Sequence, residues 1–341
     1  IKNGANINAQ DDIGRTALIN ASFNGHLKIV KYLVENGADI NANDKDGVTA
    51  LMNASKEGNL EIVKYLIENG ADINAEDNID WTALIWASYN GHLEIVKYLV
   101  ENGAEIDYYI DKSALMNASY NGHLEIVKFL IENYAEIDAK DNNGNTALMY
   151  ASISGNLEIV KLLVDNGADV DENSYFTRDS FEEYKIFTLM TACLNGNLEM
   201  VKLFIENGAD INSKGLLGDE TALIVAANSG KKDIVKYLIE NGADVNSKCS
   251  VYKYTDGYTA LMFASIRGYY EIVEILLDNK ADINATTDLG RTALMELLLG
   301  FMNGLPESGL YETVKILVDR GTDIKIKDEN RKTALDYAKE K

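Results

Sequence analysis

The chain has 341 residues, with 32 basic and 54 acidic side chains and a formal net charge of -22 at pH 7. So acidic a surface repels a phosphate backbone, and we therefore expect no nucleic-acid partner. No apolar run approaches the roughly 20 residues that a membrane-spanning helix needs, so we also expect no membrane insertion.

A Thr-Ala-Leu motif, or a close variant of it, recurs about every 33 residues along the chain. One such unit has too little core to fold alone, so its apolar faces must be covered by the neighbouring units. We therefore interpret residues 1–341 as a single repeat domain. Its expected parts are a partial N-terminal repeat 1–10, repeats that begin near residues 11, 44, 77, 108, 141, 182, 216, 254 and 287, and a C-terminal capping repeat 328–341.

The unit from Gly14 to Asn41 shows why the pattern folds. Thr16 can cap a first helix that carries Leu18 on its apolar face. Gly25 ends that helix, and an amphipathic second helix follows it and closes at Gly37. Each unit is therefore predicted to be a helix, a turn, a second helix and an extended loop, which makes the fold all-α.

The next unit resembles the ankyrin repeat. The resemblance is carried by Gly47-Val48-Thr49-Ala50-Leu51-Met52-Asn53-Ala54, Gly58-Asn59-Leu60-Glu61-Ile62-Val63 and Gly70-Ala71-Asp72-Ile73-Asn74. It extends over essentially the whole chain, although the family's Thr-Pro-Leu-His is replaced here by Thr-Ala-Leu followed by Ile or Met. The resemblance implies an all-α ankyrin-repeat solenoid of helix-turn-helix units joined by hairpin-like loops, curved as a right-handed stack. It also implies a concave surface of loop tips and inner helices that binds another protein.

The two ends of the chain differ. Ile1 aligns with Val34 of the following repeat, so we expect further repeats upstream of Ile1. The segment Ile1–Asn8 has no initiator Met and no charged-then-apolar leader, so it does not decide between a cytoplasmic and a secreted location. The last residues start a repeat with a polar tail, which is typical of a terminal cap.

Aromatic and large apolar residues gather at the variable positions in the middle of the array, where repeats differ from one another and packing does not fix the side chain. Such residues dominate the energetics of protein interfaces. The candidates in the third and fourth repeats are Ile79, Trp81, Trp86, Tyr89, Tyr108, Tyr109 and Tyr120. Packing between inner helices is the favoured interpretation for Trp86 and for Tyr150, and Trp81 is the leading candidate for a partner contact.

Two glycines expected to end second helices are replaced, by Tyr134 and Lys280. A left-handed backbone costs a residue with a Cβ atom about 1–2 kcal/mol, so we expect the loop to adjust at both positions.

Three insertions interrupt the period, at Asn173–Ile186, Ser247–Asp256 and Gly300–Gly309. The first two are predicted to form hairpin-like fingers. Further candidate contacts lie in or next to them, at Tyr175, Phe176, Phe181, Tyr184, Tyr252, Tyr254 and Tyr258. The fingers either enlarge the binding groove or fold onto its edge, and the residues do not decide between these. The third insertion is predicted to lengthen a helix and to pack on itself.

Candidate catalytic and metal-binding residues are few. The three His residues recur at one turn position, after the inter-helix Gly, and do not converge as zinc ligands do. Cys193 takes the place of a small packed residue, whereas Cys249 lies in an insertion and is expected to be more accessible. We therefore predict no metal, no cofactor and no enzymatic activity.

The resulting hypothesis is a monomeric, non-enzymatic scaffold or adaptor that binds a protein or peptide partner on its concave loop and inner-helix surface. Solvated surface charge is the favoured interpretation of the acidic excess, and attraction of a basic partner is the alternative. A first alternative is a ligand-binding module in which the aromatic insertions hold a small metabolite or a glycan. A second is a secreted microbial effector that acts on host proteins, a variant suggested by the near-absence of proline with abundant Ile, Asn and Lys.

Overall fold

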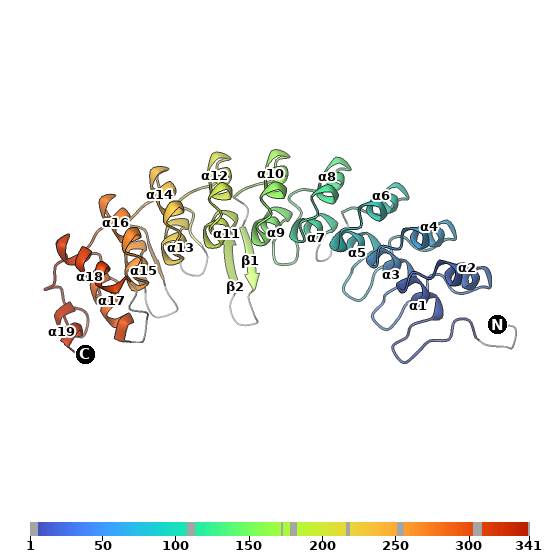
Figure 1. Cartoon of the computed structure of the whole chain (residues 1–341), viewed down its shortest axis with the longest axis horizontal. Helices are drawn as coiled ribbons and strands as arrows, with labels where there is room; N and C mark the ends of the chain where they lie inside the picture. Colours follow the sequence, from blue (N-terminus) through green and yellow to red (C-terminus); the bar gives the residue numbers. More distant parts are fainter. Residues whose placement is uncertain are drawn as a thin grey trace. The chain divides into compact units, whose positions relative to one another are not determined.

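The computed structural model describes residues 6–107, 113–171, 173–177, 183–215, 219–250, 256–302 and 309–339. The chain forms two compact units, Ile1–Asp169 (unit 1) and Val170–Lys341 (unit 2). In each unit, antiparallel helix pairs stack side by side (Figure 1). The prediction of an all-α repeat stack is confirmed.

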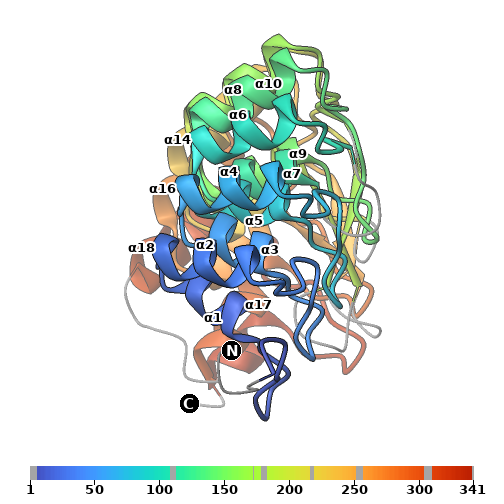
Figure 2. The ribbon, with the colours of Figure 1, turned by 90° about the vertical axis from the view of Figure 1, so that its right-hand side faces the viewer.

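Unit 1 is built from helix pairs. The first helices of these pairs are α1 (Ala17–Phe23), α3 (Ala50–Lys56), α5 (Ala83–Asn90), α7 (Ala114–Tyr120) and α9 (Ala147–Ser154). The second helices are α2 (Leu27–Glu35), α4 (Leu60–Glu68), α6 (Leu93–Glu101), α8 (Leu124–Glu132) and α10 (Leu157–Asp165). Figure 2 shows the second helices, the first helices and the connecting loops of unit 1 as three successive layers.

Capping side chains fix the ends of these helices. Each first helix of unit 1 follows a Thr or Ser whose oxygen accepts from the backbone N–H three residues later, as Thr16 does from Ile19 at 3.3 Å. Second helices end at an Asn whose side-chain amide donates to the carbonyl four residues earlier, as Asn36 does to Tyr32 at 2.7 Å. A left-handed residue, usually Gly, then turns the chain.

Tyr134 and Lys280 take this position with a left-handed backbone, as the glycines do. Their φ angles are 67° and 69°, below the 85–96° of the glycines that end the other second helices. The lower φ angle is a local adjustment of the kind expected, and the packed helices on either side keep the turn left-handed.

The core lies between neighbouring repeats. First helices contact first helices and second helices contact second helices along each unit. Leu51 and Val63 are fully buried in this seam, and so is Met52, which stands where the ankyrin consensus has His. Met52 therefore packs in the core between repeats, as expected when an apolar residue replaces the polar His of the consensus.

Polar side chains also join successive repeats. Asn41 Oδ1 accepts from the Asp72 backbone N–H at 2.8 Å, and Asn74 Oδ1 accepts from that of Glu105 at 3.0 Å. The His92 ring Nε2 lies 2.9 Å from the Lys56 carbonyl oxygen of the preceding repeat. These bonds set the register between one loop and the next.

Unit 2 repeats the same design with two hairpins added. Its helices are α11 (Thr188–Asn195), α12 (Leu198–Glu206), α13 (Ala222–Asn228), α14 (Lys232–Glu240), α15 (Ala260–Ile266), α16 (Tyr270–Asp278), α17 (Ala293–Met302), α18 (Leu310–Asp319) and α19 (Ala334–Lys339). Antiparallel strands β1 (Asn173–Thr177) and β2 (Glu183–Phe187) form one hairpin, and β3 (Lys248–Ser250) and β4 (Asp256–Thr259) form the other. The predicted hairpins are confirmed, and α17 is longer than the other first helices, as expected.

Cys249 corrects one expectation. It lies in β3 opposite Tyr258 and is only 2% exposed, although its place in an insertion suggested access to solvent. The hairpin folds this side chain inward, so insertion in the sequence does not mean exposure.

Candidate functional site

An Asp at the start of several loop tips organises the tip. In the second complete repeat, Asp44 Oδ1 accepts from the backbone N–H groups of Asp46 and Val48, both at 3.0 Å. Asp77 makes the same pair of bonds to Ile79 and Trp81, at 3.0 and 2.9 Å. This arrangement closes the turn locally and places the fifth residue of the tip next to the helix cap.

The second carboxylate oxygen of the tip Asp reaches the first helix of its own repeat. Asp77 Oδ2 accepts from Trp86 Nε1 at 3.0 Å, and Asp141 Oδ2 accepts from the Tyr150 hydroxyl at 2.6 Å. The polar end of each aromatic ring is therefore satisfied, and its ring is held in one orientation. For Tyr150, which is buried, this agrees with a packing role.

Trp81, Trp86 and Tyr89 form a contiguous group that we call the Trp81 cluster. The ring centroids of Trp81 and Trp86 lie 4.6 Å apart in an edge-to-face arrangement, and those of Trp81 and Tyr89 lie 5.4 Å apart. Both Trp side chains are half-buried, while Tyr89 is 38% exposed. Ile79, on the same loop tip, is 56% exposed.

A second aromatic pair lies further along unit 1. Tyr120, at the end of α7, is 47% exposed, and its ring stands edge-on to that of Tyr150 at 5.9 Å. Tyr120 holds the place in its repeat that Tyr89 holds in the third repeat. The first helices of unit 1 thus carry exposed aromatic side chains on two successive repeats.

The hairpins hold several of the other predicted contacts. Tyr175 and Phe176 lie in β1 and Tyr184 in β2, where Phe176 is opposite Tyr184. Tyr108, Tyr109, Phe181, Tyr252 and Tyr254 lie outside the described residues. The role of all these residues stays a prediction.

Tyr258 belongs to a set of polar and charged residues at the last repeats of unit 2, which we call the Arg291 network. The guanidinium of Arg291 lies between two buried carboxylates, with Nη1 3.7 Å from Glu296 Oε1 and Nε 3.8 Å from Asp328 Oδ2. Asp328 Oδ2 also accepts from the Tyr337 hydroxyl. Tyr258, Arg291, Glu296, Asp328 and Tyr337 thus link three successive repeats through their side chains.

The pKa values of the two carboxyl groups in the Arg291 network are shifted in opposite directions. Burial raises the pKa of Glu296, against the opposing effects of the Tyr258 hydroxyl and the Arg291 charge. Burial also acts to raise the pKa of Asp328, but hydrogen bonds led by that from Tyr337 outweigh it and hold this pKa below its ordinary value. Burial and the nearby Glu296 charge raise the pKa of Tyr258.

The sequence pointed to Tyr258 but missed Arg291 and Glu296. A usable signal existed, because Glu296 is an acid at the first-helix position where other repeats carry Asn53 or Trp86. Lys56 was also missed: its ammonium lies 4.3 Å from the centroid of the Trp86 ring. Nothing in its own repeat marks Lys56, since the ring that it contacts belongs to the next one.

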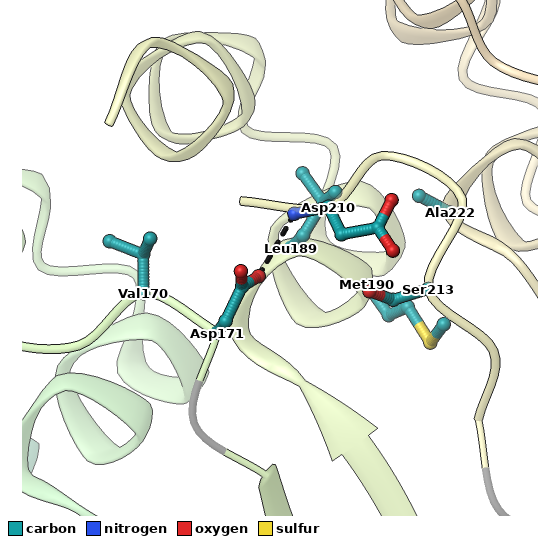
Figure 3. A pocket seen from close by; sticks show the side chains of 7 residues that line it. All are labelled: Val170, Asp171, Leu189, Met190, Asp210, Ser213 and Ala222. Atoms are coloured by element: carbon teal, nitrogen blue, oxygen red, sulfur yellow. Dashed lines mark hydrogen bonds between the residues drawn. The ribbon is translucent and has the colours of Figure 1, made fainter. Parts of the chain in front are cut away.

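A hollow in unit 2 is lined by Val170, Asp171, Leu189, Met190, Asp210, Ser213 and Ala222 (Figure 3). Asp171 Oδ1 accepts from the Asp210 backbone N–H across it at 2.9 Å. Its volume is about 220 Å³, with open solvent included. Because that figure includes open solvent, the enclosed space is smaller still, well below the roughly 300–1,000 Å³ of pockets for small ligands.

Reactive and metal-binding groups do not converge in the part of the chain that the structure describes. No group of three His, Cys, Asp or Glu side chains there is placed to hold a metal ion. Cys193 is completely buried, and this burial raises the pKa of its thiol, as expected of a packed residue. Among the described helices, none combines the length and apolar character needed to cross a membrane.

Stacked pairs of antiparallel helices, joined by capped loops and covered only by their neighbours, define a helical-repeat protein. A family model described as ankyrin repeats in three copies matches residues 1–77, 43–110, 108–174, 189–287 and 248–328. The chain belongs to the ankyrin-repeat family. A search of curated proteins finds no match. The family is typically non-enzymatic, and its repeats serve as modules for protein–protein interaction.

Proposed function

We propose that unit 1 binds a protein partner through the face formed by its loop tips and first helices, centred on the Trp81 cluster. The observation that carries this proposal is the exposure of Ile79 and Tyr89 beside two half-buried Trp rings. Aromatic side chains with an apolar border are the residues that most often dominate binding free energy at interfaces. Tyr120 extends the same face by one repeat.

Packing alone does not explain this group of side chains. The repeats stack through Leu84 and Val96, which are almost completely buried, without help from Tyr89. The equivalent positions in the preceding repeat hold Val48, Asn53 and Lys56 on the same backbone. The aromatic residues are therefore not required by the scaffold, and their exposure incurs a hydration cost that a partner would remove.

The partner is a basic protein or a basic peptide in this proposal. The chain carries 54 acidic and 32 basic side chains, which attracts a basic surface from a distance and disfavours an acidic one. Asp80 lies on the same loop tip as Trp81, and Asp46 lies on the tip of the preceding repeat.

The test is affinity capture with the full chain, followed by titration calorimetry with each purified partner. Trp81→Ala and Tyr120→Ala should each weaken binding by about tenfold or more, because they remove central aromatic contacts. Tyr32→Ala is the matched control: Tyr32 is 51% exposed, but on the second helix α2. It should change affinity by less than about twofold.

Circular dichroism must show that the three variants keep the helical content of the parent chain. Equal affinity of all three variants for the captured partner would show that the aromatic face is not the binding site. A loss of folding in Trp81→Ala would instead assign this residue to the core, and Tyr120→Ala would then decide the proposal.

A further inference from the structure

The Trp81 cluster already holds a cation. The Lys56 ammonium lies 4.3 Å from the centroid of the Trp86 ring, within the distance at which a cation is attracted by the electrons of an aromatic face. Lys56 ends α3, and its backbone carbonyl is held at 2.9 Å by the ring of His92 from the next repeat. The lysine stem therefore starts from a fixed point and brings its charge to a ring of the neighbouring repeat.

The charges around the cluster favour cations further. The Trp86 indole N–H donates to the Asp77 carboxylate at 3.0 Å, and such a bond draws electron density toward the ring and strengthens its attraction for a positive charge. The tip from Asp77 to Trp81 carries two acids and no base. Trp81 itself lies against Trp86 at 4.6 Å and remains partly open to solvent.

The tip also shows backbone strain at the residue before Trp81. Asp80 has a φ angle of 61°, whereas Gly14 and Gly47 hold this left-handed position in the preceding repeats. A carboxylate thus replaces the residue that the turn prefers, next to the most prominent ring of the cluster. Asp219 and Arg331 hold the same tip position with a left-handed backbone, so what distinguishes Asp80 is the Trp81 ring that follows it.

We propose that the Trp81 cluster is the anchor site for one arginine side chain of the partner, and that Lys56 occupies this site as a placeholder in the free protein. This inference rests on the proposed function. A guanidinium is planar, so it can stack on the open Trp81 ring while its N–H groups pair with the Asp80 carboxylate, which an ammonium does less well. Arrival of the arginine brings a second positive charge close to Lys56, which must then leave the Trp86 face.

The experiment uses the indole fluorescence of the full chain. The protein contains two tryptophans, Trp81 and Trp86, so this signal reports the cluster alone. The probes are the acetylated and amidated pentapeptides Gly-Gly-Arg-Gly-Gly and Gly-Gly-Lys-Gly-Gly, with a neutral analogue in which citrulline replaces arginine. The arginine peptide should change the fluorescence saturably and the citrulline peptide should not.

Lys56→Met tests the placeholder. This variant keeps an unbranched apolar stem and removes the ammonium, so the arginine peptide should bind roughly two- to fivefold more tightly than to the parent chain. Lys64→Met is the matched control, because the Lys64 ammonium lies 6.0 Å from the centroid of the Tyr98 ring, away from the cluster. It removes the same charge and should leave the affinity unchanged.

Each other outcome overturns the inference. Equal responses to arginine and citrulline would show that no cation is recognised, and a tighter lysine peptide would assign the site to an ammonium. An equal gain in affinity for the arginine peptide in Lys56→Met and Lys64→Met would show that Lys56 acts only through the net charge of the protein. If Trp81→Ala still abolishes capture of the protein partner in these cases, the proposed function stands and only the arginine anchor is lost.

Discussion

The Trp81 cluster in unit 1 and the Arg291 network in unit 2 use the same positions of the repeat for opposite purposes. Trp81 and Arg291 both precede the residue that caps a first helix, and Trp86 and Glu296 are both the fourth residue of that helix. In unit 1 the polar atom of Trp86 is satisfied and the rings are left partly open. In unit 2, Arg291 Nε and Glu296 Oε1 are buried without a hydrogen-bond partner.

This difference distinguishes side chains that are available to a partner from side chains that join repeats to one another. A side chain whose polar end is bonded within its own repeat can present its remaining surface to a partner at little cost. Buried charges that meet across three repeats are instead needed to compensate one another, because removal of one leaves the others without a partner of opposite charge. The repeat position therefore fixes where a side chain lies, and its neighbours decide whether it is available for binding.

The largest expected effect on stability is that of replacing Arg291, and Arg15 at the same position of another repeat allows a direct comparison. Arg291→Ala should lower the free energy of unfolding by about 2–3 kcal/mol, because Glu296 and Asp328 lose the charge that compensates their burial. Arg15→Ala is the matched variant, since Arg15 Nε lies 3.4 Å from Asp44 Oδ2 but its side chain is 35% exposed. We expect its effect to be below about 1 kcal/mol.

Urea unfolding distinguishes the two arginine variants when it is followed by two signals. Circular dichroism reports both units, whereas Trp fluorescence reports unit 1. Arg291→Ala should therefore bring forward the loss of helical signal while the fluorescence transition stays near its original midpoint. Equal, small effects of the two substitutions would mean that the Arg291 network does not stabilise unit 2.

The second prediction concerns pH. Because burial raises the folded-state pKa of Glu296 above its unfolded value of 4.5, ionisation of this residue costs stability. That cost is fully present above the folded-state pKa and disappears as the pH falls toward 4.5. Glu296→Gln removes the ionisable group, so its stability relative to the parent chain should rise as the pH increases above 4.5 and should level off above the folded-state pKa.

The measurement is the difference in unfolding free energy between Glu296→Gln and the parent chain at several pH values, which cancels the titration of the other carboxylates. Glu57, which is exposed at the C-terminal end of α3, provides the control variant Glu57→Gln. If the difference in unfolding free energy between Glu296→Gln and the parent chain does not change with pH, the prediction that ionised Glu296 lowers stability is wrong.

The smallest effect is expected at the strained tip of the Trp81 cluster. Asp80→Gly should raise the free energy of unfolding of unit 1 by about 0.5 kcal/mol, because relief of the left-handed strain exceeds the entropy cost of glycine. The reciprocal change is Gly290→Asp at the tip next to Arg291, where φ is 73° and a Cβ atom would lie 3.1 Å from Asp328 Cα. It should be destabilising, as measured by the same urea experiments, and a stabilising effect there would remove the contrast between the two tips.

The repeats, their caps and the helix order were predictable from the sequence. Thr16 and Gly37 act through a hydrogen bond and a φ angle within their own repeat, and the same signals return in most of the repeats. Tyr134 shows the limit of this local reasoning, because the packed helices around it impose a left-handed backbone that the residue itself disfavours.

The candidate site was predictable only in part. Trp81, Tyr89 and Tyr120 stood out because they are large residues at positions that vary between repeats, and the structure leaves them half-buried or exposed. Their role in binding stays a prediction.

The repeat, the local ends of its helices and the positions at which side chains are free to vary could all be read from the order of residues along the chain. The tertiary structure alone decided which of these side chains meet: Lys56 with Trp86, Arg291 with Asp328, and Cys249 with Tyr258. The physical reason is that hydrogen bonds and steric preferences within a repeat depend on neighbours along the chain. Contacts between repeats and across hairpins depend instead on the packing that brings separate segments together.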